Sequence, residues 1–126
     1  MEIKLSKNSE GIYLLELAGN LDLTGSNQLK EFVMKMIKIR VDSFIINLRS
    51  VAGINSAGVG ALIYIYSTLR KLNCSLIMLV PRGPVLEALE VSRIRNYFTI
   101  VHTLKEALDL SGKKSRVRIG KGLPVD

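Results

Sequence analysis

The sequence predicts an α/β fold in a single domain, with a mixed sheet of four or five strands and about four helices packed on it. Two short, continuous apolar runs, residues 44–48 and 76–80, are typical of strands covered on both faces. Residues 56–71 lie between them and carry apolar side chains at helical spacing. A strand, a helix and a strand in this order predict a right-handed crossover between two parallel strands.

The amino-terminal part adds two strands and a helix to this unit. Residues 1–7 alternate apolar and charged side chains, and residues 12–17 are β-prone, so both are predicted strands; we place a turn at Gly19 and Asn20. A helix follows, and Thr24 or Ser26 is the expected cap. The apolar residues of that helix recur on one face at Leu29, Phe32, Val33, Met36 and Ile37.

The carboxyl-terminal part contributes two more helices and a strand. Pro84 is suited to the first position of a short helix because its missing amide hydrogen is not needed there. Residues 97–101 predict a final strand, and residues 103–110 predict a last helix. For the long central helix we expect an inner face made by Val59, Leu62, Ile63, Tyr66 and Leu69.

Charge is distributed unevenly along the 126 residues. The net charge is +7, of which +4 falls in residues 111–126 and only +3 in residues 1–110. Apolar periodicity also ends near Leu110, while glycine and proline become frequent. We therefore predict a domain over residues 1–110 and a basic, flexible C-terminal tail over residues 111–126. We do not expect nucleic-acid binding, for which this tail is the sole support.

Cysteine content and hydropathy indicate the compartment. Cys74 is the sole cysteine, so no disulfide can form within the chain, and we interpret it as a small buried hydrophobic residue. The chain begins without the basic and apolar segments of a secretory signal, and its longest apolar stretch is too short for a membrane span. We expect a cytoplasmic location.

The strongest candidate for a functional site is the segment Asn55, Ser56, Ala57, Gly58, Val59, Gly60. It follows a buried strand and opens a helix, so Ser56 should lie at the helix amino terminus, at the sheet edge where ligands and partners meet α/β proteins. Free backbone amides and the helix dipole would hold a phosphate attached there. Asn55 could cap the helix, Gly58 and Gly60 would keep its start slim, and Asp22 could lie across the same edge. Taken alone, a serine in this position is also typical of a purely structural cap.

These features together resemble the STAS family. The resemblance rests on the order of elements, on the run from Gly19 to Asp22 before the first helix, and on the run from Asn55 to Gly60, and it extends over residues 1–110. It implies an anti-sigma factor antagonist that is phosphorylated on Ser56. It further implies that the unmodified form binds a serine-kinase anti-sigma factor, that the phosphorylated form releases it, and that a PP2C-type phosphatase resets the cycle. The implied partner-binding residues are Asp22, Asn55, Ser56, Ala57, Gly58, Val59 and Gly60.

Two residues depart from the family pattern. Asn55 stands where the family generally has aspartate, which removes a negative charge beside Ser56; Arg93 stands where glycine is common. Asn55 keeps an alternative open, a STAS module without phosphorylation that serves a transporter or a sensory complex. The sequence also leaves open whether the chain forms a homodimer.

Catalysis is not expected. His102 has no second histidine, cysteine or carboxylate at ligand spacing, so we predict a surface or strand-end residue, no metal and no cofactor. Neither a phosphate-binding loop nor a dinucleotide-binding fingerprint is present, and no nucleophile, base and orienting group can be assembled.

Overall fold

One five-stranded mixed sheet forms the centre of the protein in a computed structural model that describes residues 1–39, 41–92 and 98–111. The strands lie in chain order across the sheet: β1 (Glu2–Lys7), β2 (Tyr13–Leu21), β3 (Ser43–Ile54), β4 (Ser75–Leu79) and β5 (Thr99–Val101). β1 runs antiparallel to β2, and the other neighbouring strands are parallel. This confirms the predicted fold class.

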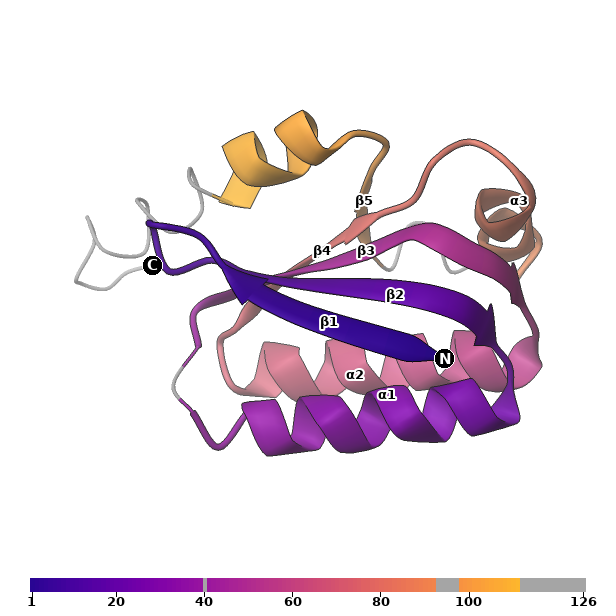
Figure 1. The fold of residues 1–126 in the computed structure, drawn as a ribbon, viewed down its shortest axis with the longest axis horizontal. Coiled ribbons are helices and arrows are strands. Elements are labelled where there is room, and N and C mark those ends of the chain that lie inside the picture. Colours follow the sequence, from indigo (N-terminus) through magenta and orange to yellow (C-terminus); the bar gives the residue numbers. More distant parts are fainter. Residues whose placement is uncertain (40, 93–97, 112–126) are drawn as a thin grey trace.

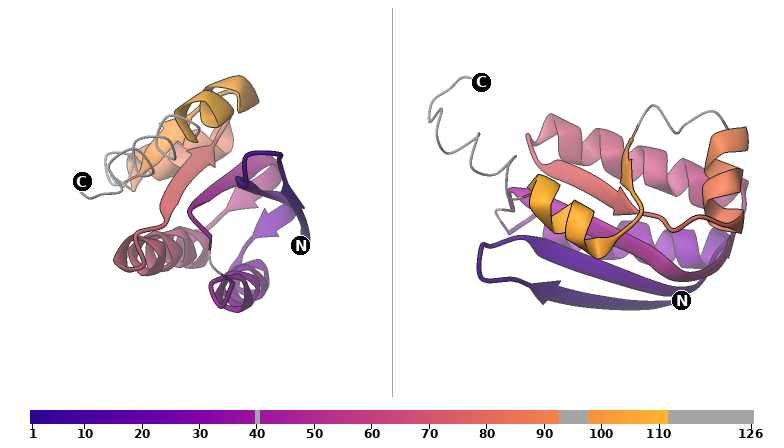
Figure 2. Two further views of the ribbon diagram at one scale, coloured as in Figure 1. Left: turned by 90° about the vertical axis from the view of Figure 1, so that its left-hand side faces the viewer. Right: turned by 90° about the horizontal axis from the view of Figure 1, so that it is seen from above.

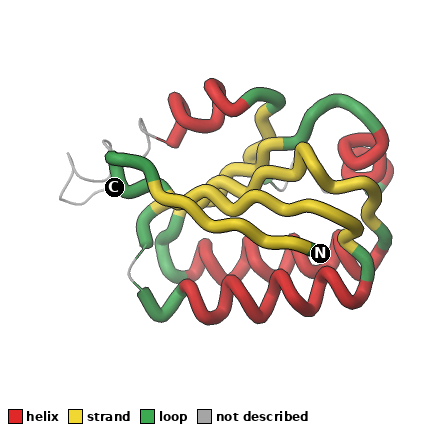
Figure 3. Tube along the Cα trace, viewed as in Figure 1, coloured by secondary structure: helices red, strands yellow, loops and turns green. Residues whose placement is uncertain are grey.

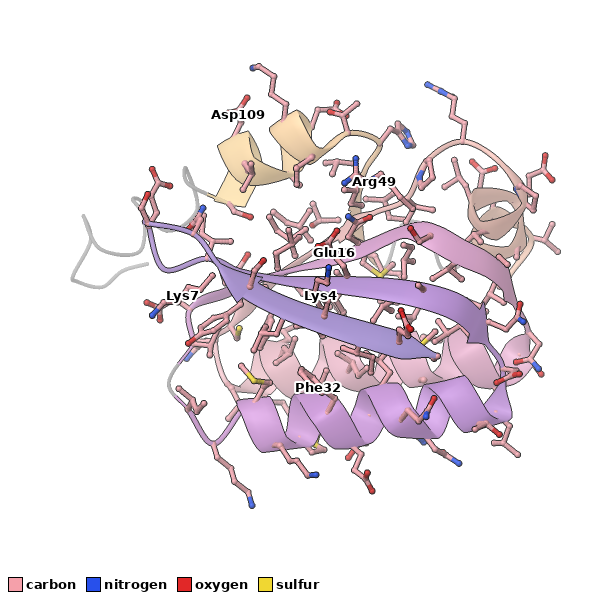
Figure 4. All side chains as sticks on the ribbon, viewed as in Figure 1. Lys4, Lys7, Glu16, Phe32, Arg49 and Asp109 are labelled. Carbon is pink, nitrogen blue, oxygen red and sulfur yellow. The ribbon has the colours of Figure 1, made fainter. Side chains whose placement is uncertain are left out.

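Two long helices cover one face of the sheet. α1 (Leu23–Met36) connects β2 to β3, and α2 (Ser56–Lys71) connects β3 to β4 with the bounds that the sequence predicts. They lie side by side, with their amino termini at the same end of the molecule (Figures 1 and 2). Because both connections cross the sheet in the same direction with the same hand, both helices fall on the same face. Phe32 of α1 lies between the helix and the sheet (Figure 4).

The other face of the sheet is covered in part. A helix at residues 104–111 packs over a small apolar cluster made by Ile12, Ile45, Ile77, Leu79 and Ala107. α3 (Pro84–Val91) lies beside the carboxyl ends of the parallel strands, with Pro84 as its first residue as predicted. Figure 3 shows the helix pair on one side of the sheet, the helix at residues 104–111 on the other side, and α3 at the end of the strands.

Both strands that lead into the long helices continue further than predicted. The prediction of a turn at Gly19 and Asn20 is wrong, because β2 runs through both residues to Leu21. The register between β2 and β3 shifts at these positions, and Gly19 adopts a φ of +113°, so an irregularity absorbs the residues that resembled a turn. β3 likewise runs on to Ile54.

Other local expectations had mixed outcomes. The cap of α1 is Asp22, and neither Thr24 nor Ser26 fills that position. The inner face of α2 includes Ala61 and Ile65 in addition to the predicted residues. Cys74 is buried as expected, and His102 follows β5 with its Nδ1 atom 2.9 Å from the carbonyl oxygen of Val80.

Some expectations fall on residues outside the described ranges. These are Arg93, the start of the strand predicted at residues 97–101, and the tail from residue 112 onward. The last described helix reaches Ser111, which is buried and lies one residue beyond the predicted domain boundary.

Candidate functional site

The carboxyl ends of β2 and β3 form the frame of the candidate site. Leu21 and Ile54 are register partners at the end of the parallel pair, and each is followed by the cap of a helix. The backbone amide of Asn55 donates a hydrogen bond to the carbonyl oxygen of Leu21 at 3.4 Å. The amino termini of α1 and α2 therefore lie next to each other at this edge, as Figure 1 shows.

Short polar side chains cap both helices in the same way. Oδ1 of Asp22 accepts the amide hydrogen of Gly25 at 2.9 Å, and Oδ1 of Asn55 accepts that of Gly58 at 3.1 Å. Asparagine and aspartate are about equally good caps, so Asn55 preserves the helix start while leaving it uncharged. The first turn of α2 contains no acidic residue, so no side chain there offsets the positive end of its dipole.

The two glycines of the motif have different surroundings. A Cβ atom at Gly58 would overlap the carbonyl oxygen of Leu21 and lie 2.7 Å from Cγ1 of Ile54. Gly58 is buried, so its small size allows α2 to approach the ends of β2 and β3 and does not leave room for a partner. Gly60 is exposed, and a Cβ atom there would meet open space.

Ser56 is the first residue of α2 and is exposed. Asn55 provides the cap, and within the described residues the hydroxyl of Ser56 makes no hydrogen bond. The structural role expected of a serine at a helix start is thus carried out by its neighbour. The hydroxyl is available for modification without the loss of a contact that holds the helix.

A groove of about 420 Å³ runs from the start of α2 to α3, with Ser56 in its wall. Its lining is Ile54, Asn55, Ser56 and Val59 on one side and Pro84, Glu87, Ala88, Val91 and Ser92 on the other. Within this lining Val91 is 82% exposed; Leu23, at the start of α1 and outside the lining, is 64% exposed. Exposed apolar residues along a groove are typical of protein-interaction surfaces.

The α3 side of this groove was missed by the sequence reasoning. The available signal was the position of Val91 outside the inner face formed by Val85, Leu86 and Leu89. That signal indicates an exposed apolar residue but not its neighbours, because the proximity of α3 to α2 depends on the tertiary fold.

Within the described residues, no group of three or more histidine, cysteine or acidic side chains is arranged to hold a metal ion. In the same residues, no helix is long and apolar enough to cross a membrane.

The sequence profile of the STAS domain matches residues 5–107. The chain belongs to the STAS domain family. Its match includes every described strand except the start of β1, together with the caps Asp22 and Asn55 and the whole of α2. No curated protein sequence is significantly similar to this STAS domain.

Solved structures share the fold of this STAS domain at low sequence identity. A putative anti-sigma factor antagonist from Thermotoga maritima has a TM-score of 0.79 and 15% identity, covering 86% of this chain and 93% of its own. The anti-sigma factor antagonist SpoIIAA in its unphosphorylated form has a TM-score of 0.70 and 21% identity, with coverage of 86% and 94%. A sulfate transporter family protein from Wolinella succinogenes has a TM-score of 0.68 and 18% identity, with coverage of 85% and 88%.

Proposed function

We propose that this STAS domain is an anti-sigma factor antagonist that acts without catalysis, as a cytoplasmic switch between partners. In its unmodified form it binds a serine-kinase anti-sigma factor through the edge that contains Asp22 and residues 55–60. Phosphorylation of Ser56 releases that partner, and a PP2C-type phosphatase restores the binding form. Membership of the family and the fold shared with anti-sigma factor antagonists support this function.

The observation that carries the proposal is the free hydroxyl of Ser56 beside a cap made by Asn55. A phosphate on this hydroxyl meets the uncompensated positive end of α2, where an anion is stabilised. The fold therefore tolerates the modification. The same phosphate brings a charge of about −1.5 to −2 to the surface near neutral pH.

The groove between α2 and α3 explains how this charge would act on a partner. Its lining is largely apolar, so the partner surface that fills it is expected to be apolar too. A phosphate on Ser56 would have to lose water inside that interface, in a groove that also contains the carboxylate of Glu87. A loss of about 3 kcal/mol, roughly a hundredfold in affinity, lies within the range of such mismatches.

Asn55 supports a second candidate function. In place of the aspartate usual in the family, it leaves the surface beside Ser56 without the negative charge that a kinase could recognise. The second candidate is an accessory module of a transporter or sensory complex that is not phosphorylated, and the fold shared with a sulfate transporter family protein is consistent with it. Co-purification with membrane components and not with a soluble kinase would favour this candidate.

The experiment that separates the two uses the cognate kinase and ATP. The proposed function predicts one phosphate per chain, on Ser56, and no phosphate on Ser56→Ala. Ser9→Ala removes an exposed hydroxyl from a loop at another part of the molecule and serves as the control that stays phosphorylated. A phosphate on another residue, or none, contradicts the proposal.

A further inference from the structure

A second apolar pocket lies at the opposite end of the helix pair from Ser56, where α1 and α2 end (Figure 1). Its volume is about 200 Å³. In the described part of the chain, its lining consists of apolar side chains and one thiol: Ile37, Ile39, Val41, Phe44, Leu69, Leu72 and Cys74. Neither the proposed phosphorylation nor the partner groove involves these residues.

The pocket has a buried floor and an exposed apolar mouth. Phe44, Leu69 and Cys74 are buried, whereas Ile39 is 53% exposed and Leu72 is 55% exposed. Cavities of about 150 Å³ with comparable lining bind small aromatic hydrocarbons. This pocket is therefore large enough for an unbranched chain of about six to eight carbons, with further carbons covered by the two residues at the mouth.

The charged residues near the mouth indicate the chemistry of the polar end of a ligand whose apolar end fills the pocket. Lys38 precedes Ile39, Lys71 precedes Leu72, and Lys35 and Arg70 lie in the last turns of the two helices, all of them exposed. Among the described residues, Asp42 is an acidic residue next to the pocket, directly after Val41 of its lining. Cations are common at the carboxyl ends of helices because of the dipole, and together these four cations give this end of the helix pair a positive charge that Asp42 offsets only in part.

The same charges argue against a second copy of the chain as the occupant. Two copies that met at this end would bring two sets of lysine and arginine residues together, and like charges repel. A ligand with an apolar chain and an anionic head would instead satisfy both the lining and the mouth.

We propose that this pocket binds the acyl chain of a free, medium-chain fatty acid, with its carboxylate among Lys38, Lys71 and the neighbouring cations. The inference does not depend on the proposed function, because it concerns the other end of the helix pair. It predicts that the protein responds to a soluble amphiphile independently of phosphate on Ser56.

Cys74 provides a direct reporter, because it is the only cysteine in the chain and forms part of the pocket floor. Its rate of reaction with the small neutral reagent methyl methanethiosulfonate is measured by mass spectrometry on the full chain. Decanoate at ten times its dissociation constant should slow the reaction by about tenfold. Octanoate should bind roughly tenfold more tightly than hexanoate, because two more methylene groups are buried.

Head-group and charge-reversal arms test the role of the cations. Decanoate should protect Cys74 at lower concentration than decanol, and decyltrimethylammonium should protect it least. Lys38→Glu and Lys71→Glu should each weaken protection by decanoate by about fivefold and leave protection by decanol unchanged. Lys4→Glu makes the same charge change on an exposed strand residue that lies on the sheet face away from α1 and α2 (Figure 4), and it should have no effect.

Four outcomes overturn the inference. The first is that no amphiphile protects Cys74 below its critical micelle concentration. The second is equal protection by all three head groups, which would indicate adventitious binding of an apolar additive only. The third is a loss of protection in Lys4→Glu that matches the loss in the other two variants. The fourth is protection that increases with protein concentration alone, which would assign the pocket to contact between copies of the chain.

Discussion

The carbonyl oxygen of Leu21 accepts a hydrogen bond from the backbone amide of Asn55 at 3.4 Å, which joins the end of β2 to the residue that caps α2. Asp22, the cap of α1, directly follows Leu21. This contact and the pairing of Leu21 with Ile54 at the ends of β2 and β3 together bring the two helix starts side by side, with Ser56 at the exposed edge.

Gly58 and Gly60 form a matched pair for testing the close approach of α2 to β2. Gly58→Ala should destabilise the protein by about 2 kcal/mol or more, because the added Cβ atom would overlap the carbonyl oxygen of Leu21. Gly60→Ala adds the same atom to open space within a helix and should stabilise the protein by about 0.5–1 kcal/mol. Urea unfolding measures both changes, and equal effects at the two positions would show that the approach of the helix is not tight.

Asn55 should contribute to the stability of the protein by capping α2. Asn55→Ala removes the acceptor for the amide of Gly58 and should cost about 0.5–2 kcal/mol of unfolding free energy. Asn55→Asp retains the acceptor and adds a charge at the positive helix end, so it should be neutral or stabilising by up to about 1 kcal/mol. Thermal unfolding at low salt distinguishes the two variants, and similar losses in both would mean that the side chain of Asn55 does not cap α2 in solution.

Val91 tests the groove as a partner contact. Val91→Ser should weaken binding of the partner kinase by about tenfold or more, because an exposed apolar contact is lost from the interface. Its effect on stability should be within about 0.5 kcal/mol, since the side chain is almost fully exposed and the two residues have similar helix propensity. Ile39→Ser changes an exposed apolar residue at the other end of the molecule and should leave kinase affinity unchanged. If both variants bind the kinase as the parent does, the groove is not the interface.

Glu106 gives the last helix a dependence on pH. Its carboxylate accepts hydrogen bonds from the backbone amide of His102 and from the amide and hydroxyl of Thr103, and these bonds lower its pKa from 4.5. A carboxyl group with a lowered pKa in the folded state contributes stability above its unfolded pKa, and that contribution is lost as pH falls through the folded value. In Glu106→Gln the stability should therefore fall less steeply than in the parent as pH decreases below about 4.5. Melting temperatures of parent and variant that remain parallel from pH 7 to pH 3 would contradict this.

The sequence was sufficient to predict that the candidate site lies at a helix start, because that placement depends on local patterns. The apolar spacing of residues 56–71 predicts the bounds of α2, and the position of Ser56 at its start follows directly. The prediction of a turn at Gly19 and Asn20 was wrong because residues common in turns also occur at irregularities inside a strand. Only the pairing of β2 with β3 distinguishes a turn from an irregularity inside a strand at these residues.

Features that depend on several elements could not be predicted from one sequence. The burial of Gly58 against Leu21 requires the position of β2 relative to α2, and the groove requires the position of α3. The apolar pocket at the other end is formed by Leu69 of α2, by Phe44 of β3 and by the segments that follow α1 and α2. In each case the residue types are visible in the sequence, but their proximity is not.

The most direct test of the proposed switch measures the affinity of the cognate kinase for the unmodified chain and for the chain phosphorylated on Ser56, together with the melting temperature of each. We expect roughly a hundredfold weaker binding after phosphorylation and a melting temperature that is unchanged or slightly higher, because the start of α2 accommodates the anion. Equal affinities, or weaker binding accompanied by a clear fall in melting temperature, would contradict the account.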